Sequence, residues 1–218
     1  MVVATEAGAS STLEAIILAG GAGSRFGGGK LTAPWRDGVV LDGALRAAFA
    51  APVRSVMVVT GADPLVAPAA RAWARAHGQS PRLRLIHAPD HAEGMAATLR
   101  AGIAALPADV DAAFIFLGDM PLIPVTIPPR LAEALASGAL AAAPVFEGRR
   151  GHPVLFSRAL FKALAALKGD EGARSVLREA DRKFLSASLS AAVPVALVET
   201  EDLGIFSDVD FPCDLSSG

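Results

Sequence analysis

The stretch that decides the fold is residues 16–31, which read Ile16-Ile-Leu-Ala-Gly-Gly-Ala-Gly-Ser-Arg-Phe-Gly-Gly-Gly-Lys30-Leu31. A continuous apolar run, typical of a strand buried on both faces, gives way here to a segment with six glycines, one arginine and one lysine. Glycines allow positive φ, so successive N–H groups can converge on one anion. Arg25 and Lys30 add mobile positive charge. The stretch therefore predicts a phosphate-binding turn between a strand and a helix.

Two familiar glycine motifs do not fit this stretch. A Walker A motif needs glycine, four residues and then Gly-Lys-Ser/Thr, but Ser24 stands at the first glycine position and Leu31 follows the lysine. The dinucleotide-binding fingerprint also fails, because Phe26 stands at its last glycine. Taken alone, the stretch leaves open a second interpretation, a plain glycine loop that binds nothing.

Composition and charge restrict the class of protein. The 218 residues are 52% hydrophobic and 19% charged, with a formal net charge of −2, which describes a compact domain without a basic face. We therefore expect no nucleic-acid partner and no binding to membranes. Apolar runs are interrupted well before the ~18 residues that a membrane helix needs. A single cysteine, Cys213, excludes an internal disulfide bond and favours a reducing compartment, so we expect a cytoplasmic location.

The N-terminal segment is expected to differ from the rest of the chain. Residues 1–13 contain no Lys or Arg and no apolar core, so they do not resemble a secretory signal and are predicted to form a flexible tail. Residues 14–218 show no internal repeat and no linker. They are therefore predicted to form a single domain.

Apolar runs and helical patterns alternate along this domain. Strands are expected over residues 15–18, 53–59, 83–87, 112–117, 141–146, 154–156 and 193–198. Helices are expected over residues 41–49, 127–136, 159–167 and 172–180, with two more that end near residues 77 and 106. This alternation indicates βαβ units and an α/β fold with a mainly parallel sheet. Ligands bind outside the carboxyl ends of such strands, so the glycine-rich loop and Asp119 are expected at one rim.

Three aspartates offer oxygen ligands for a cation. Asp119 leaves the end of a buried strand, where an unpaired carboxylate would be costly if dry, and Asp208 and Asp210 come from the far end of the chain. Mg²⁺ prefers a few hard oxygen ligands, with phosphate oxygens completing its shell. No cluster of His and Cys suggests zinc instead. The alternative interpretation is that these aspartates only cap turns.

Together, these motifs resemble the molybdenum cofactor cytidylyltransferases, a branch of the nucleotidyltransferases that use a Gly-rich signature loop. The matching segments are Leu18-Ala-Gly-Gly-x-x-x-Arg25-Phe-Gly-x-x-Lys30, Glu93-Gly-Met95, Leu99-Arg-Ala-Gly102, Gly118-Asp-Met-Pro121, Gly148-Arg-Arg-Gly-His-Pro-Val-Leu-Phe156 and Asp208-Val-Asp-Phe-Pro212. The resemblance covers about residues 14 to 215. It implies a three-layer Rossmann-like nucleotidyltransferase fold, in which helices flank a mainly parallel mixed sheet with one antiparallel strand.

The resemblance also implies an enzyme and its reaction. A terminal phosphate of molybdopterin would attack the α-phosphate of CTP, giving molybdopterin cytosine dinucleotide and pyrophosphate. The implied cofactor is Mg²⁺, with Mn²⁺ as the alternative. The implied partners are molybdopterin, the nucleotide, and a molybdoenzyme or its maturation chaperone.

Site residues follow from the same resemblance. Arg25, Lys30 and Asp119 would be catalytic, and Asp119 with Asp210 or Asp208 would hold the metal ion. Lys30 would lie beside the α-phosphate. The nucleotide-binding residues would be Leu18, Ala19, Gly20, Gly21, Ala22, Gly23, Ser24, Arg25, Lys30, Thr60, Gly94, Met95 and Asp119. Arg150 and His152 would receive the acceptor, although a histidine before proline can also simply fix a turn.

Alternatives remain open at this point. Ala19-Gly20-Gly21 is closer to the family's guanylyl members, and Ala96-Ala97 stand where hydroxyls are frequent, so the base is open between cytosine and guanine. The alternative activities are guanylyl transfer to the same cofactor and nucleotidyl transfer to a sugar phosphate. A non-enzymatic alternative is a nucleotide-binding or cofactor-binding maturation chaperone.

Overall fold

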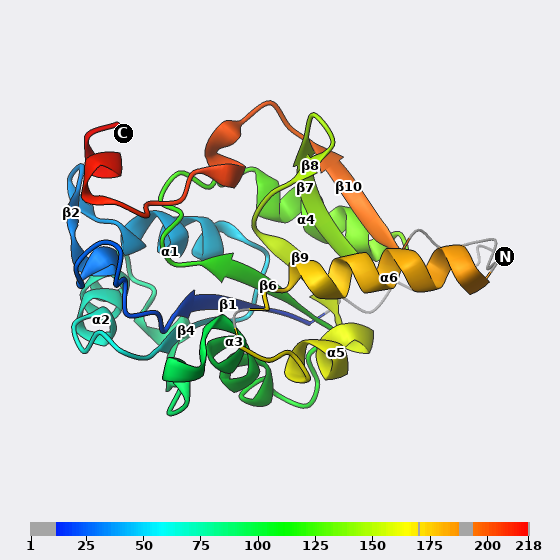
Figure 1. Ribbon diagram of the computed structural model, residues 1–218, viewed down its shortest axis with the longest axis horizontal. Coiled ribbons are helices and arrows are strands. Elements are labelled where there is room, and N and C mark those ends of the chain that lie inside the picture. Colours follow the sequence, from blue (N-terminus) through cyan, green and yellow to red (C-terminus); the bar gives the residue numbers. More distant parts are fainter. Residues whose placement is uncertain (1–11, 170, 188–193, 218) are drawn as a thin grey trace, which may run out of the picture.

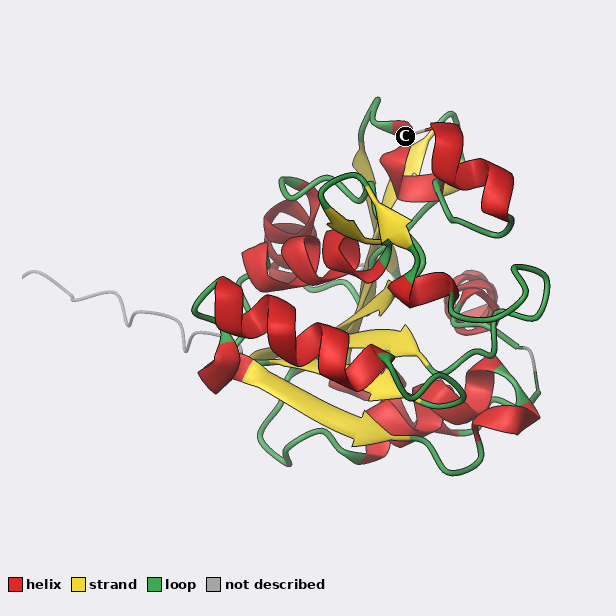
Figure 2. Ribbon diagram, turned by 90° about the vertical axis from the view of Figure 1, so that its left-hand side faces the viewer, coloured by secondary structure: helices red, strands yellow, loops and turns green. Residues whose placement is uncertain are grey.

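The computed structural model describes residues 12–169, 171–187 and 194–217, which form three layers with a central sheet between helices (Figures 1 and 2). The strands of the main sheet are β1 (Leu13–Ala19), β4 (Val56–Thr60), β5 (Leu83–His87), β6 (Ala112–Leu117), β7 (Ala141–Phe146), β8 (Arg149–Arg150), β9 (Val154–Ser157) and β10 (Val195–Glu199). The helices are α1 (Leu41–Ala50), α2 (Val66–Ala76), α3 (Met95–Ala104), α4 (Ile127–Ala136), α5 (Phe161–Ala165) and α6 (Arg174–Ala187).

The sheet has the order β10-β7-β9-β6-β1-β4-β5, with β8 paired to β7. Strands β6, β1, β4 and β5 are parallel neighbours, and β10 runs parallel to β7. Strand β9 is antiparallel to both β6 and β7. The predicted mainly parallel sheet with one antiparallel strand is therefore confirmed, and the two-residue β8 adds a short antiparallel pairing that was not predicted.

Two apolar clusters hold the layers together. Ala15 and Ile17 of β1 belong to the cluster that includes side chains of α1, α2 and α4. Ile16 and Leu18 alternate with them and belong to the cluster with α3, α5 and α6. A strand that contacts helices on both faces is mainly apolar, which explains the continuous run over residues 15–19. The exception in β1 is Glu14, which is buried and paired with Arg54 at 2.7 Å.

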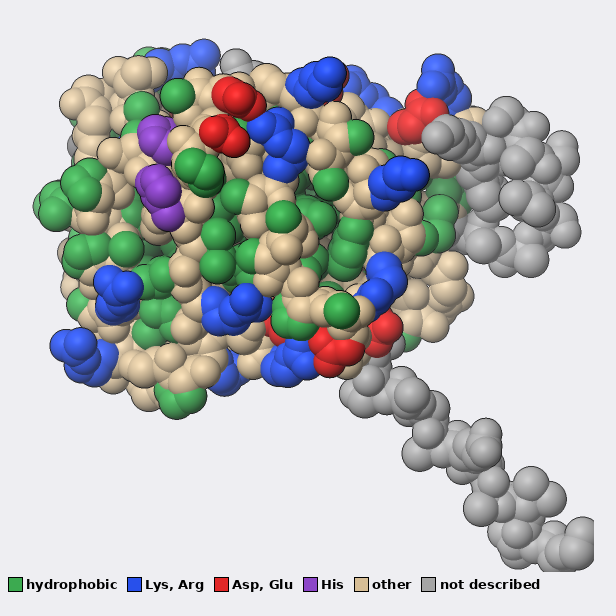
Figure 3. Space-filling model, turned by 90° about the horizontal axis from the view of Figure 1, so that it is seen from below, with side chains coloured by type: hydrophobic (Ala, Val, Ile, Leu, Met, Phe, Trp, Pro, Cys, Tyr) green, Lys and Arg blue, Asp and Glu red, His purple; other side chains and the backbone are tan. Residues whose placement is uncertain are grey.

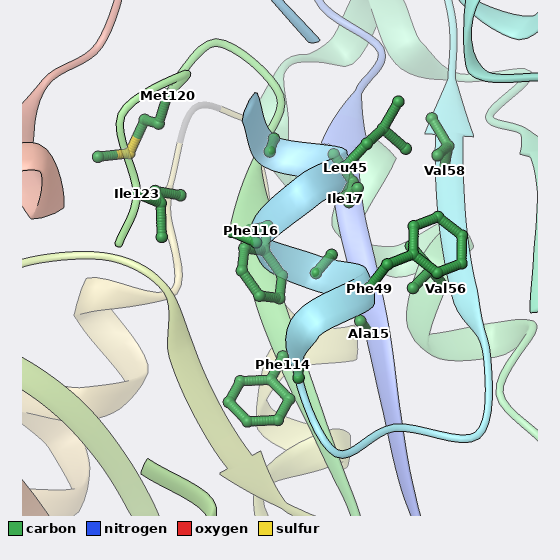
Figure 4. Close-up of a cluster of buried hydrophobic side chains, with 14 of the residues drawn as sticks. Ala15, Ile17, Leu45, Phe49, Val56, Val58, Phe114, Phe116, Met120 and Ile123 are labelled. Carbon is green, nitrogen blue, oxygen red and sulfur yellow. The ribbon is translucent and has the colours of Figure 1, made fainter. Parts of the chain in front are cut away.

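Helix α1 packs over the strands that carry the candidate site. In Figure 4, Leu45 and Phe49 of α1 lie over Ile17 of β1 and the valines of β4. Phe116 of β6 is fully buried in the same cluster, and truncating such a phenylalanine to alanine typically costs about 3–5 kcal/mol. The sheet is thus a firm base for the loops that follow β1 and β6.

The turn after β6 is fixed by close contact with α1. Met120 is 2% exposed and lies beside Ile123 in Figure 4. A Cβ at Gly43 of α1 would overlap the backbone carbonyl of Pro121, so only glycine lets α1 approach this closely. This packing holds Asp119, which lies between Gly118 and Met120, at a defined position.

Most predicted elements are confirmed, with differences at their ends. Strand β1 begins at Leu13, which the expected tail included, and residues 1–11 of that tail lie outside the described residues. Helix α6 extends to Ala187 instead of ending near residue 180. The predicted last strand began at residue 193, which also lies outside the described residues. A hairpin of β2 (Pro34–Trp35) and β3 (Gly38–Val39) was not predicted, because two-residue strands give no periodic signal.

Charged side chains are dispersed on the face that carries α3 and α5. Lys and Arg side chains are scattered there among uncharged, hydrophobic and acidic side chains (Figure 3). Within residues 12–169, 171–187 and 194–217, no helix combines the length and the apolar character that crossing a membrane requires.

Candidate active site

The glycine-rich loop begins where β1 ends and curls back on itself. The N–H groups of Phe26 and Gly28 donate to the carbonyl oxygen of Gly23 at 2.9 and 3.1 Å. Four glycines of the loop have φ between 60° and 94°, a backbone conformation that is strained for residues with a side chain. The loop then enters a 3-10 helix over Lys30–Thr32. This path returns Lys30 to the carboxyl ends of the strands.

Lys30 lies between two aspartates from distant parts of the chain. Its Nζ is 2.6 Å from Oδ2 of Asp119 and 3.2 Å from Oδ1 of Asp210. Arg25 is 3.9 Å from Asp210, and its side chain is 75% exposed at the rim. The structure therefore brings together the loop, the turn after β6 and the C-terminal segment, as the sequence predicted.

Burial and charge act in opposite directions on the pKa of Lys30. Partial burial lowers this pKa, but the charges and hydrogen bonds of Asp119 and Asp210 outweigh it, so the pKa is raised above its usual value. Lys30 is therefore an ammonium ion at neutral pH. It is the cation on which the two carboxylates converge.

The segment around Asp208 is tied directly to the turn after β6. The N–H of Val209 donates to the carbonyl oxygen of Asp119 at 2.9 Å. Burial raises the pKa of Asp208, and the nearby carboxylates of Asp210 and Asp119 raise it further. Three carboxylates thus lie close enough to interact electrostatically.

Asp214 positions this segment and was not singled out from the sequence. Its Oδ2 accepts the N–H groups of Phe211 and Asp210, both at 2.8 Å, and these hydrogen bonds lower its pKa. Asp214 therefore fixes the backbone that presents Asp210. The pattern of an aspartate four residues after another is too common for sequence reasoning to have selected it.

The aspartates can hold a divalent cation only if a bound substrate contributes oxygen ligands as well. In the part of the chain that the structure describes, no group of three His, Cys, Asp or Glu side chains is arranged to hold a metal ion by itself. Asp119 and Asp210 nevertheless share one cation, Lys30, and Asp208 lies near them. Mg²⁺ typically binds through one or two carboxylates and completes its shell with water and phosphate oxygens. The donor set fits that mode of binding.

The loop forms one wall of a pocket of about 590 Å³ at the strand ends. Near Lys30 and Asp119 the lining is charged. Around Gly20 the lining consists mainly of small uncharged residues such as Ala19, Ala62 and Ala92, with the carboxylate of Asp63 beside them. The Gly20 carbonyl accepts the N–H of Ala62 at 3.1 Å, and the Gly20 backbone lies against Thr98. The predicted nucleotide-binding residues that line this pocket are Leu18, Ala19, Gly20, Gly21, Ala22, Gly23, Ser24, Lys30, Gly94, Met95 and Asp119.

Two of the predicted nucleotide-binding residues, Arg25 and Thr60, do not line this pocket. Thr60 is the last residue of β4, is 8% exposed, and donates its hydroxyl to the carbonyl oxygen of Ile86 at 3.2 Å. It therefore links β4 to β5. The neutral part of the pocket instead includes Ala62, Ala92 and Thr98, which the sequence analysis did not select.

A second pocket, of about 420 Å³, adjoins the first and shares Leu18, Met95 and Leu117 with it. Its lining includes the cationic side chains of Arg149 and Arg174. Apolar side chains of β6, such as Ile115, and of the turn after it complete much of the wall. The second pocket thus combines two arginines, the carboxylate of Asp208 and a mainly apolar surface next to the first.

The structure distinguishes the two arginines of the Gly148–Pro153 motif. Arg150, the predicted acceptor residue, forms an ion pair with Asp181 at 2.6 Å and does not line the second pocket. Arg149 does line it, and its guanidinium lies 4.5 Å from the ring centroid of Phe206. Successive strand residues point to opposite sides, so only one of the pair can face the pocket. The sequence could not show which one.

His152, the other predicted acceptor residue, lies in the wall of the second pocket. Its Nδ1 is buried and has no hydrogen-bond partner among the described residues. Burial lowers the pKa of His152 to about 4, and the charge of Arg174 contributes to this lowering. The imidazole is therefore neutral at neutral pH and carries an unused hydrogen-bonding nitrogen.

Folding stability should consequently depend on pH through His152. The folded pKa of about 4 lies below the ordinary value of 6.5, so the unfolded chain binds the proton more tightly. Stability is then lost as the pH falls from about 6.5 to about 4, by roughly 3 kcal/mol at most. Urea unfolding between pH 4 and 7.5 should show a steeper loss for the wild type than for His152→Leu. The exposed-site control His87→Gln should keep the wild-type slope, and equal slopes for the wild type and His152→Leu would contradict the expectation.

Comparisons with known proteins agree with this geometry. The model of the family described as "MobA-like NTP transferase domain" matches residues 15–184. The chain is 26% identical to the molybdenum cofactor cytidylyltransferase of Escherichia coli K12 over 94% of each protein. It is 29% identical to the purine catabolism protein PucB of Bacillus subtilis 168, over 93% of this chain and 94% of that protein.

Solved structures share the fold. The crystal structure of Rv0371c from Mycobacterium tuberculosis H37Rv has a TM-score of 0.70 with 24% sequence identity, and covers 96% of this chain and 97% of that chain. The same protein in complex with manganese has a TM-score of 0.63 with 22% identity, covering 88% and 89% of the two chains. These values support the Rossmann-like nucleotidyltransferase architecture.

Proposed function

The chain belongs to the MobA-like NTP transferase domain family and is a nucleotidyltransferase, and we propose that it transfers CMP from CTP to the terminal phosphate of molybdopterin, releasing pyrophosphate. The proposal for the acceptor is supported by the E. coli relative, which is a molybdenum cofactor cytidylyltransferase. It is also supported by a site with two adjoining pockets, one for each substrate.

The orientation of the nucleotide follows from the distribution of charge in the first pocket. Phosphates should lie at the charged part, where the loop N–H groups of residues 22–24 and Lys30 can neutralise them, with the exposed Arg25 nearby at the rim. The base and ribose should lie at the neutral part, against Gly20 and Gly94. In this orientation the α-phosphate lies beside Lys30 and Asp119.

The reaction requires positioning and charge neutralisation rather than a covalent intermediate. An oxygen of the acceptor phosphate forms a bond to the α-phosphorus while the bond between that phosphorus and the α,β-bridging oxygen breaks. Pyrophosphate leaves with the electron pair. Lys30 stabilises the negative charge that develops on the α-phosphate. A divalent cation held by Asp119 with Asp210 or Asp208 would supply further neutralisation at the same phosphate when bound.

The second pocket suits an anionic, ring-containing acceptor. Arg149 and Arg174 provide positive charge beside the carboxylate of Asp208, and the neutral imidazole of His152 forms part of the wall. Because the two pockets share Leu18, Met95 and Leu117, a molecule in the second can reach the charged part of the first. A phosphorylated pterin has the required chemistry.

One observation carries the proposal: Lys30 is held by Asp119 and Asp210 beside these two adjoining pockets. Isothermal titration of the intact protein with each nucleoside triphosphate and Mg²⁺ tests it. We expect binding of CTP that weakens when Mg²⁺ is chelated. If no nucleoside triphosphate binds, the proposal is wrong.

A second candidate keeps the reaction and changes the base. Gly20 matches the guanylyl members that the sequence resembles, so GTP is the alternative donor. Competition between CTP and GTP in the same titration separates the two. If GTP bound about tenfold or more tightly than CTP, guanylyl transfer would become the proposed activity in place of cytidylyl transfer.

Arg149 should contribute to acceptor binding more than its neighbour Arg150. Arg149→Gln removes a charge from the second pocket, so the KM for molybdopterin should rise about tenfold while the affinity for the nucleotide changes less than about twofold. Arg150→Gln removes an ion pair with Asp181 outside the pocket, so its effect on the acceptor KM should be smaller. Steady-state kinetics with varied acceptor provides the comparison. Equal effects of the two substitutions would contradict this placement.

A further inference from the structure

Arg149 begins the second strand of a hairpin whose geometry is set by its turn. Strands β7 and β8 are joined by Glu147 and Gly148, which have φ values of 48° and 75°. Two consecutive residues with positive φ give a tight turn whose twist matches that of an antiparallel pair. In the register of this pair Arg149 lies opposite Phe146. The turn therefore fixes the point at which the Arg149 side chain leaves the backbone.

The 3-10 helix that ends at Phe206 is joined to this hairpin by backbone contacts. The N–H of His152 donates to the carbonyl oxygen of Ile205 at 2.9 Å. A Cβ at Gly151 would lie 2.6 Å from that same oxygen, so the two backbones are already as close as glycine allows. Arg149 and Phe206 are thus presented by two segments in direct contact.

The guanidinium of Arg149 stacks on the ring of Phe206. Its Cζ lies 4.5 Å from the ring centroid, well inside the range of a cation–π interaction. In the part of the chain that the structure describes, no salt bridge and no side-chain hydrogen bond engages this guanidinium, so the ring is the contact that locates it. The neighbouring Arg150 is held differently, by an ion pair with the carboxylate of Asp181 at 2.6 Å.

A stacked guanidinium keeps its hydrogen-bond donors available. Stacking uses the face of the planar group, whereas its N–H donors point outward in the plane. An ion pair with a carboxylate would instead occupy donors and neutralise the charge. Because Arg149 and Phe206 both line the second pocket, a charged fork of free donors is available there.

Without the ring, the guanidinium would have other places to go. Asp208 lines the same pocket, so its carboxylate could compete with a ligand for an unstacked Arg149. An arginine side chain also has many rotamers, and fixing one of them when a ligand binds costs affinity. A ring that holds the guanidinium in advance reduces this cost.

We propose that Phe206 is a positioning residue for the acceptor, because it holds the Arg149 guanidinium over its ring with the N–H fork free to bind an anionic group of the acceptor. Phe206 acts through Arg149 and not through the reacting atoms. This inference rests on the proposed function, which places the acceptor in the second pocket.

The experiment measures kcat and the KM for molybdopterin, at saturating nucleotide and Mg²⁺, for the wild type, Phe206→Leu and Phe206→Tyr. Leucine keeps an apolar side chain but removes the aromatic face, so we expect the KM to rise about fivefold while kcat changes less than about twofold. Tyrosine keeps the face and should keep the KM within about twofold of the wild type. Leu203→Ala is the matched control, since it changes an exposed side chain of the same 3-10 helix that lines neither pocket, and its KM should equal that of the wild type.

A double-mutant cycle tests whether Phe206 acts through Arg149. In the Arg149→Gln background the guanidinium is absent, so adding Phe206→Leu should raise the KM less than about twofold. A fivefold rise in that background overturns the inference, as does an unchanged KM for Phe206→Leu alone. It is also overturned if Phe206→Tyr raises the KM as much as Phe206→Leu does. Circular dichroism verifies folding, and failure of both Phe206→Leu and Phe206→Met to fold would make Phe206 a core residue and likewise overturn the inference.

The NMR signal of the Arg149 Nε–H group gives a readout that does not depend on the acceptor. Its assignment comes from its loss in Arg149→Gln. The ring current of Phe206 should displace this signal, so Phe206→Leu should move it toward the position typical of exposed arginines and Phe206→Tyr should not. Titration with inorganic phosphate should shift the signal in the wild type and should shift it less in Phe206→Leu.

The outcomes separate this inference from the proposed function. A wild type that transfers the nucleotide to molybdopterin, together with an unchanged KM in Phe206→Leu, rejects only the role of Phe206. A wild type that transfers none rejects the proposed function, and the phosphate titration then decides the role of Phe206. An equal response in the wild type and Phe206→Leu overturns that role, and a weaker response in Phe206→Leu supports it for an anion other than molybdopterin.

Discussion

Asp119→Asn is expected to reduce turnover about 1,000-fold while the protein remains folded. The substitution keeps the size of the side chain and its ability to accept a hydrogen bond, but it removes the negative charge from the end of β6. Under the proposed function this charge holds both the Lys30 ammonium, at 2.6 Å, and the divalent cation. Pyrophosphate release under saturating nucleotide and acceptor measures the effect.

The matched control for Asp119 is Glu201→Gln, which changes an exposed carboxylate to an amide away from both pockets. Its turnover should equal that of the wild type. Titration with Mn²⁺ in the presence of nucleotide adds a second readout, because Asp119→Asn should weaken metal binding and Glu201→Gln should not. Near-normal turnover of Asp119→Asn would remove this residue from the catalytic site.

Lys30→Ala should lower kcat about 100-fold and change the affinity for the nucleotide less than about threefold. Backbone N–H groups of the loop and Arg25 remain available to hold the β- and γ-phosphates, so ground-state binding should persist. The ammonium matters most when negative charge develops on the α-phosphate. Rapid-quench measurements of the chemical step, combined with titration of the nucleotide, separate the two effects.

Lys162→Ala in α5 serves as the control for Lys30, since it removes an exposed lysine that lines neither pocket. It should leave kcat and nucleotide affinity at wild-type values. If Lys30→Ala instead weakened nucleotide binding and left turnover intact, Lys30 would be a binding residue only. The assignment of the α-phosphate to the position beside Lys30 would then be wrong.

The fold could be predicted largely because local sequence reports burial. β1 and β6 are central strands covered on both faces, so residues 15–19 of β1 and all of β6 read as apolar runs that are followed by glycine. Parallel order then places the loops after them at one rim, which is why Lys30 and Asp119 could be expected together. Short pairings such as β2 with β3 carry no such signal.

The parts of the site that the sequence did not show depend on contacts across elements. Thr98 becomes notable only because α3 packs its first turn onto Gly20 just after β1. Arg149 and Arg150 are adjacent and chemically identical, and the pairing of β8 with β7 decides which one faces the second pocket. Thr60 was placed at the nucleotide by the family resemblance, but its hydroxyl is used between β4 and β5.

The product of the complete reaction tests the central claim most directly. The protein is incubated with molybdopterin, Mg²⁺ and each nucleoside triphosphate in turn, and pyrophosphate is quantified while the pterin product is identified by mass spectrometry. We predict that CTP yields pyrophosphate and molybdopterin cytosine dinucleotide in equal amounts. No dinucleotide from any nucleoside triphosphate, or pyrophosphate released without incorporation of the nucleotide, would contradict nucleotidyl transfer to molybdopterin at this site.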